Sequence, residues 1–184
     1  FLRPLPGRQQ MNDPVKSKGN PRFAFLCTHP FHLVSLGFGS GLSPIMPGTA
    51  GTLFAWIVYD VLTFLWPTIF TPLVWGCLCI TGFLFGIKTC QATGEALCSP
   101  DDGSMVWDEI IAFWLVLLFV TPASFLSECI AFVVFRFFDM TKPPPIRFFD
   151  RHIHGGFGVM LDDIIAAFFT LLVFALWKTC MMAN

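Results

Sequence analysis

Long stretches of uncharged sequence constrain this chain more than any other feature. Residues 23–59, 61–87 and 110–127 contain no Asp, Glu, Lys or Arg. A helix needs about 20 mostly apolar residues to cross the hydrocarbon core of a bilayer. The runs lack the alternating pattern of barrel strands, and helices satisfy their own backbone hydrogen bonds in lipid. We therefore expect an all-α, multi-pass integral membrane protein.

Composition supports this class and excludes others. Only 12% of the residues are charged and 55% are apolar, whereas soluble domains carry roughly 25% charged residues. A formal net charge of −1 argues against a basic, nucleic-acid-binding protein. The seven cysteines show no zinc-ligand spacing. We expect a polar, basic N-terminal tail at 1–28, partly disordered, followed by one membrane-embedded catalytic domain at 29–184, and the oligomeric state stays open.

The apolar runs divide into five candidate spans. These cover about residues 49–66, 69–89, 104–120, 122–138 and 159–178. The fourth is the weakest, because Glu128 and Arg136 bracket only seven uncharged residues, so four to five spans are expected. Before them, residues 31–48 are apolar but interrupted by Gly and Pro, which predicts a short helix followed by a re-entrant or interfacial segment.

The distribution of charge predicts the orientation of the spans. With the N-terminal tail in the cytoplasm, ten of the eleven Lys and Arg residues fall on the cytoplasmic side, and only Lys178 falls outside. This is the bias that the positive-inside rule describes. Three helix ends then bring carboxylates to the same cytoplasmic face: Asp108-Glu109, Asp139 and Asp162-Asp163.

Two acidic pairs, Asp108-Glu109 and Asp162-Asp163, lead directly into apolar helix. Carboxylates that lie close together repel one another unless a cation joins them. All-oxygen ligands suit a hard divalent ion, with Mg²⁺ the usual choice beside phosphate. The alternative is that these acids only favour helix N-termini through the helix dipole; two pairs and Asp139 on one face favour the metal.

Basic residues surround these acids between Phe135 and Arg151. Arg and Lys beside a carboxylate–metal site fit a phosphate-bearing substrate, although attraction to anionic lipids is an alternative. Thr49, at the start of the first span, suits either phosphate binding or helix capping. His154 suits a loop hydrogen bond or proton donation. No nucleophile motif is present, which leaves a metal-activated water as the simpler mechanism.

These residues resemble a known family, phosphatidylglycerophosphatase A of bacteria, over roughly residues 29–175. The matching motifs, in chain order, are Gly37-Phe38-Gly39-Ser40-Gly41-Leu42-Ser43-Pro44, Pro47-Gly48-Thr49, Val106-Trp107-Asp108-Glu109, Phe135-Arg136-x-x-Asp139-Met140-x-Lys142-Pro143-x-Pro145-Ile146-Arg147-x-x-Asp150-Arg151, His154-Gly155-Gly156-x-Gly158 and Asp162-Asp163. One departure is Thr52, where the family has Ser. The resemblance implies a Mg²⁺-dependent lipid phosphatase of the bacterial inner membrane, which hydrolyses phosphatidylglycerophosphate to phosphatidylglycerol in phospholipid and cardiolipin synthesis.

A hypothesis for the site follows from the charges and the resemblance together. Mg²⁺ ligands are expected at Asp108, Glu109, Asp139, Asp162 and Asp163, with catalytic roles for Asp108, Asp139 and Asp163. Phosphate contacts are expected at Thr49, Arg136, Lys142 and Arg147. Secondary roles in the site are expected for Glu95, Asp101, Asp150, Arg151 and His154. The acyl chains would stay in the bilayer. A transporter or ion channel using the acidic pairs as an ion path is the alternative, although the acids lie at one face and no internal repeat is present.

Overall fold

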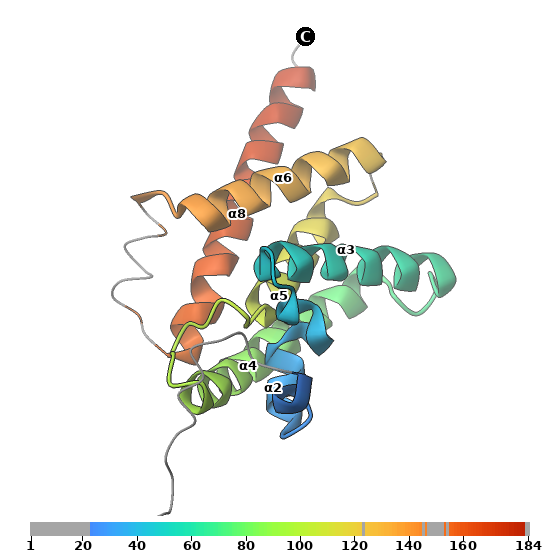
Figure 1. Ribbon diagram of the computed structural model, residues 1–184. Helices are drawn as coiled ribbons and strands as arrows, with labels where there is room; N and C mark the ends of the chain where they lie inside the picture. The colour runs from blue at the N-terminus through green and yellow to red at the C-terminus, as the bar shows by residue number, and fades with distance from the viewer. Residues whose placement is uncertain (1–22, 123, 145, 147–152, 154, 183–184) are drawn as a thin grey trace, which may run out of the picture.

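The described part of the chain, in a computed structural model, is entirely helical. It comprises residues 23–122, 124–144, 146, 153 and 155–182. Residues 1–22 of the predicted N-terminal tail lie outside it. The elements, drawn in Figure 1, are α1 (Phe23–Leu26), α2 (Pro30–Ser35), the 3-10 helix η1 (Gly37–Leu42), α3 (Pro47–Leu65), α4 (Pro72–Ala96), α5 (Trp107–Val120), α6 (Phe125–Thr141) and α8 (Gly156–Met182). No strand occurs among these residues, so the all-α prediction is confirmed.

Local sequence explains where the long helices begin. Both α3 and α4 have a proline in their first turn, where its missing N–H costs no hydrogen bond. The hydroxyl of Thr71 accepts a hydrogen bond from the backbone N–H of Val74 at the start of α4. Ser124 does the same for the N–H of Ser127 at the start of α6. These caps satisfy donors that a helix start leaves unpaired.

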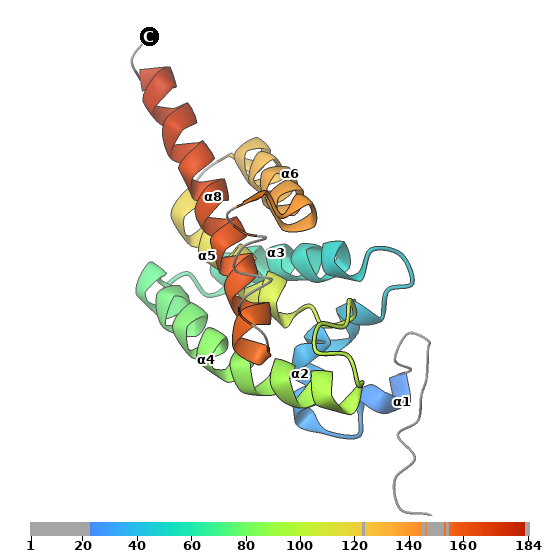
Figure 2. The same cartoon turned by 90° about the vertical axis from the view of Figure 1, so that its left-hand side faces the viewer.

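Helix α5 forms the centre of the fold. Its side chains Ile110, Ile111, Phe113, Val116 and Leu117 have no exposed surface. It packs against α3, α4, α6 and α8, and Figure 2 shows it enclosed among them. Because α5 starts with Trp107, Asp108 and Glu109, this packing holds an acidic pair where several helices meet.

Three helices are long and apolar enough to cross a membrane: Pro47–Leu65, Pro72–Ala96 and Gly156–Cys180. The expectation of four to five spans is therefore not confirmed. With 14 residues, α5 extends only about 21 Å at 1.5 Å per residue, short of the roughly 30 Å hydrocarbon core. Its apolar sequence reflects burial by other helices, which hydropathy does not distinguish from contact with lipid.

Residues 31–48 contain a short helix and then an irregular segment, as their glycines and prolines predict. Within η1, Phe38 and Gly39 have positive φ angles of 55° and 104°. A Cβ at Gly41 would lie 2.0 Å from the carbonyl oxygen of Ser104, and the N–H of Val106 donates to the carbonyl of Ser35. This part of the chain therefore packs against the loop that leads into α5 and forms a hydrogen bond to it. Its expected insertion into the bilayer stays a prediction.

Candidate metal and phosphate site

A polar cleft of about 340 Å³ lies where α3, α5, α6 and α8 meet. The first turns of α3 and α5, the last turns of α6 and the loop before α5 form its walls, and α8 contributes its acidic pair. The lining residues are Met46, Pro47, Gly48, Asp101, Gly103, Met105, Asp108, Glu109, Arg136, Asp139, Met140, Lys142, Asp162 and Asp163. The fold thus gathers charged side chains that lie far apart in the sequence.

Three carboxylates form the innermost group of the cleft. One oxygen each from Asp108, Glu109 and Asp163 lies within 4.8 Å of the other two. Asp108 and Asp163 are 7% and 3% exposed. Asp108 and Glu109 open α5, and Asp163 comes from α8, so the close packing of these two helices creates the group.

Several oxygens of this group lack hydrogen bonds. Asp108 Oδ1, Glu109 Oε2 and Asp163 Oδ2 are buried and accept none from the described residues. A buried carboxylate oxygen without a donor is costly. A hard cation accepts several carboxylate oxygens, so Asp108, Glu109 and Asp163 are suited to hold Mg²⁺.

Burial and mutual repulsion also affect the protonation of the acidic pair at the start of α5. This helix is not one of the three that are long and apolar enough to cross a membrane. Burial, followed by the charges of Glu109 and Asp162, raises the pKa of Asp108 well above its usual value. Burial and then Asp139 raise the pKa of Glu109 to about 8, although Arg136 opposes this shift. Without a cation, the pair therefore retains protons that ordinary carboxylates lose.

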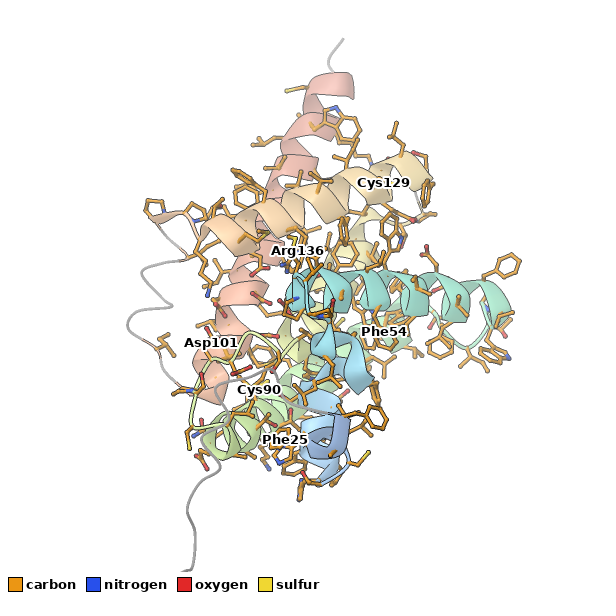
Figure 3. All side chains as sticks on the ribbon, viewed as in Figure 1. Phe25, Phe54, Cys90, Asp101, Cys129 and Arg136 are labelled. Atoms are coloured by element: carbon orange, nitrogen blue, oxygen red, sulfur yellow. The ribbon has the colours of Figure 1, made fainter. Side chains whose placement is uncertain are left out.

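Among the described residues, two cationic side chains line the cleft. Arg136 of α6 forms ion pairs with Asp139 and, at 3.4 Å, with Glu109 Oε1. Figure 3 shows its side chain between α6 and α3. Lys142, at the left-handed end of α6 with a φ of 40°, forms an ion pair with Asp162. Positive charge thus lies directly beside the carboxylate group, where a phosphate would be neutralised.

The start of α3 approaches this cluster closely because residue 48 is glycine. A Cβ at Gly48 would lie 2.0 Å from Glu109 Oε1 and 2.9 Å from Arg136 Nη2. Arg136 Nη1 also donates to Thr52 Oγ1 at 3.5 Å. Glycine therefore allows the Glu109–Arg136 pair to rest against the backbone of α3.

Comparison with known proteins identifies the family of this chain. The family model described as Phosphatidylglycerophosphatase A matches residues 33–178. The chain belongs to the phosphatidylglycerophosphatase A family. A protein of Escherichia coli named Phosphatidylglycerophosphatase A is 43% identical over 139 residues, which cover 76% of this chain and 78% of the relative. A Haemophilus influenzae protein of the same name is 40% identical over 158 residues, covering 85% and 94%.

A third relative has a different name. A Bacteroides thetaiotaomicron protein, named as a candidate phosphatidylinositol-3-phosphatase, is 37% identical over 147 residues, covering 78% of this chain and 90% of the relative. No solved structure matches this chain. Sequence comparison therefore shows that the chain belongs to the phosphatidylglycerophosphatase A family, as the motifs predicted. One relative is named for a different lipid phosphate substrate.

The structure brings together most residues that the sequence singled out for a phosphatidylglycerophosphatase A site. In the cleft lie Asp101, Asp108, Glu109, Arg136, Asp139, Lys142, Asp162 and Asp163. Thr49 is not among the lining residues, and its buried hydroxyl has no partner in the described chain. Glu95 lines a separate pocket, where it accepts a hydrogen bond from Gln91. Four other candidates lie outside the described residues: Arg147, Asp150, Arg151 and His154.

Sequence reasoning missed several residues of this site. Gly48 and Met140 were recognised only as parts of motifs, Met46 was given no role, and Thr52 was considered only as one of the hydroxyls at the start of the first span. The role of Gly48 could have been predicted, because a glycine in the first turn of a helix has no Cβ and allows another group to approach the backbone closely. Nothing in the sequence indicates that Thr52 meets Arg136, since 84 residues separate them.

Proposed function

We propose that this chain is a Mg²⁺-dependent lipid phosphatase that hydrolyses phosphatidylglycerophosphate to phosphatidylglycerol and phosphate. The observation that carries the proposal is the buried group of Asp108, Glu109 and Asp163, beside Arg136 and Lys142 in one cleft. The names of the Escherichia coli and Haemophilus influenzae relatives support the choice of substrate. The reaction would contribute to phospholipid synthesis.

Each charged group has a part in this proposal. Asp108, Glu109 and Asp163 would hold Mg²⁺, which when bound supplies positive charge for phosphate oxygens and makes water more acidic. Arg136 and Lys142 exchange their partners Asp139 and Asp162 for the phosphate oxygens and neutralise their charge. Positioned cations of this kind are a general means of phosphoryl transfer.

Asp139 is the proposed proton acceptor. It lines the cleft at the end of α6, where Arg136 holds its carboxylate. When Arg136 turns to the phosphate, Asp139 can take a proton from the attacking water. The water oxygen forms a bond to phosphorus, and the bond from phosphorus to the glycerol oxygen breaks. That oxygen takes a proton from bulk water, and Asp139 returns its own proton to bulk water, so that lipid and water become alcohol and phosphate.

The position of the cleft supports a site on the cytoplasmic face of the bacterial inner membrane. The cleft contains Arg136 and Lys142, and the positive-inside rule places such cations in the cytoplasm. Its acidic residues collect at one end of the helices rather than along a path through them. This arrangement does not favour the alternative of an ion path.

One experiment tests the function. Purified protein in detergent is given phosphatidylglycerophosphate, phosphatidic acid or phosphatidylinositol 3-phosphate, with Mg²⁺ or EDTA, and released phosphate is measured. We expect EDTA-sensitive release, fastest from phosphatidylglycerophosphate, and at least a hundredfold loss in Asp108→Asn. Asp60→Asn is the matched control, because Asp60 lies in a different pocket with Tyr59 and Glu128. Release that EDTA leaves intact, or a faster reaction with another lipid, would overturn the metal or the substrate.

A further inference from the structure

Helices α3 and α6 lie side by side but meet mainly through side chains. They run antiparallel, with the start of α3 and the end of α6 at the cleft (Figure 1). Trp56 Nε1 donates to Glu128 Oε2 at 3.0 Å, and the Trp56 ring packs on Phe125 and Phe132 at centroid distances of 5.5 and 5.7 Å. Close backbone packing instead joins each helix to α5. We call this boundary the α3–α6 seam.

The cleft occupies one end of the α3–α6 seam. Gly48 of α3 and Arg136 of α6 face each other there, and Arg136 reaches Thr52 across the boundary. Two methionines, Met46 and Met140, line the cleft and are about half exposed. Exposed apolar side chains therefore reach the rim of the cleft at the start of α3 and at the end of α6.

One flank of the seam is apolar and exposed. Ile57 follows Trp56 by one residue on α3, and Val133 follows Phe132 by one on α6. Successive residues turn by about 100° around a helix, and in antiparallel neighbours this rotation takes both side chains to the same flank. Ile57 is 56% and Val133 63% exposed. The preceding residues, Ala55 and Ala131, are buried on the opposite flank.

We propose that this exposed flank of the α3–α6 seam seats the acyl chains of the substrate lipid while its phosphate lies in the cleft. The inference rests on the proposed function. Charge complementarity determines the orientation of the lipid. Arg136 and Lys142 lie at the cleft end of the seam, so the negatively charged phosphate binds there and the acyl chains extend along the flank. A lipid on this flank reaches the carboxylate group without leaving the bilayer, and Thr52 gives up its contact with Arg136 as the phosphate binds.

Another apolar hollow does not offer this continuity. It has a volume of about 720 Å³ and is lined by the ends of α5 and α8 and the start of α6, including Phe119, Ser127 and Trp177. Asp108 opens α5, whereas Phe119 is near its last residue. A lipid seated in that hollow would hold its phosphate at the wrong end of α5, away from Asp108 and Glu109.

Bulky substitutions on the flank test the inference. Ile57→Trp and Val133→Trp would obstruct acyl chains on the flank, about two and a half turns from Gly48 on α3 and about one turn from Arg136 on α6. The matched controls are Ile80→Trp on α4 and Val173→Trp on α8, which also replace exposed apolar residues. For each variant, kcat/KM is measured with dioleoyl and with dihexanoyl phosphatidylglycerophosphate, since the shorter chains cover less of the flank.

We expect both seam variants to lose about tenfold in kcat/KM on the dioleoyl lipid, equivalent to about 1.4 kcal/mol. The loss on the dihexanoyl lipid should be several times smaller, and the controls should lose less than either seam variant. Equal losses on both lipids, or seam variants no worse than their controls, would overturn the inference alone. If the wild-type protein hydrolyses neither lipid, the proposed function itself fails. Ile57→Phe and Val133→Phe replace any Trp variant that does not fold.

Discussion

Replacing Gly48 with alanine should separate catalysis from stability in this protein. The added Cβ would lie 2.0 Å from Glu109 Oε1 and 2.9 Å from Arg136 Nη2. Ordinary contacts begin near 3.4 Å, so the Glu109 carboxylate must move by about 1.4 Å in a closely packed site. A misplacement of about 1 Å can cost roughly a hundredfold in rate. We therefore expect kcat to fall about a hundredfold.

Stability should respond far less to this change. Gly48 lies in the first turn of α3, so alanine gains at most the roughly 0.5–1 kcal/mol by which it is favoured over glycine in the middle of a helix. The groups that must move are the ends of the Glu109 and Arg136 side chains, so the net change in unfolding free energy should stay below about 1 kcal/mol.

The assay for Gly48→Ala combines phosphate release from phosphatidylglycerophosphate with the unfolding midpoint in detergent. Gly76→Ala is the matched control, because a Cβ there meets nothing closer than Leu118 at 4.0 Å. An unchanged kcat in Gly48→Ala, with normal folding, would refute the role of the Glu109–Arg136 pair. A large loss of stability would instead show that α3 itself is displaced.

Three further predictions concern separate parts of the site. The pKa of Glu109 is raised from 4.5 to about 8, so the stability of the metal-free protein should fall as pH rises from about 4.5 to 8. The increase in unfolding midpoint that Mg²⁺ produces should grow over the same pH range. Glu109→Gln should weaken both trends, and a pH-independent Mg²⁺ effect would contradict this. Lys142→Met should raise KM about tenfold or more, since a charged hydrogen bond contributes about 1.5–3 kcal/mol, and an unchanged KM would remove Lys142 from phosphate binding. Trp56→Phe should destabilise the fold by about 1–3 kcal/mol, because the buried Glu128 carboxylate loses its indole donor; the same change in a Glu128→Leu background should cost less, and equal costs would exclude the coupling.

The cleft could be anticipated largely because acidic residues are rare in this chain. An acidic pair directly before an apolar run, as at Asp108-Glu109, indicates both a helix start and a functional position. The helix indeed begins at Trp107. Topology then placed the other acidic pair and the basic residues of α6 on the same face, and Asp163, Arg136 and Lys142 all line the cleft.

The roles of individual carboxylates could not be assigned in this way. Asp162 and Asp163 are neighbours on α8, and a rotation of about 100° separates them. Asp163 meets Asp108 and Glu109, whereas Asp162 meets Lys142. Sequence alone gives no reason to prefer one over the other, because the choice depends on how α8 packs against α5.

Hydropathy alone also did not predict where the helices end. The predicted span at 69–89 stops where polar residues begin, yet α4 continues to Ala96. Thr93 is buried there by the packing of α2 on α4, and its hydroxyl meets His32 Nδ1 of α2 at 3.0 Å. Conversely, α5 has the hydropathy of a span but the length of a core helix. Packing between elements, which periodicity does not encode, decides both cases.

The most direct test of a metal-dependent phosphatase site in this cleft is the rate of phosphate release by Asp163→Asn at saturating Mg²⁺. Asp163 enters the carboxylate group only through the packing of α8 on α5, and it is almost fully buried. We predict at least a hundredfold lower rate on phosphatidylglycerophosphate than in wild type or Asp60→Asn, with folded protein in all three. A wild-type rate in folded Asp163→Asn would contradict the proposed site.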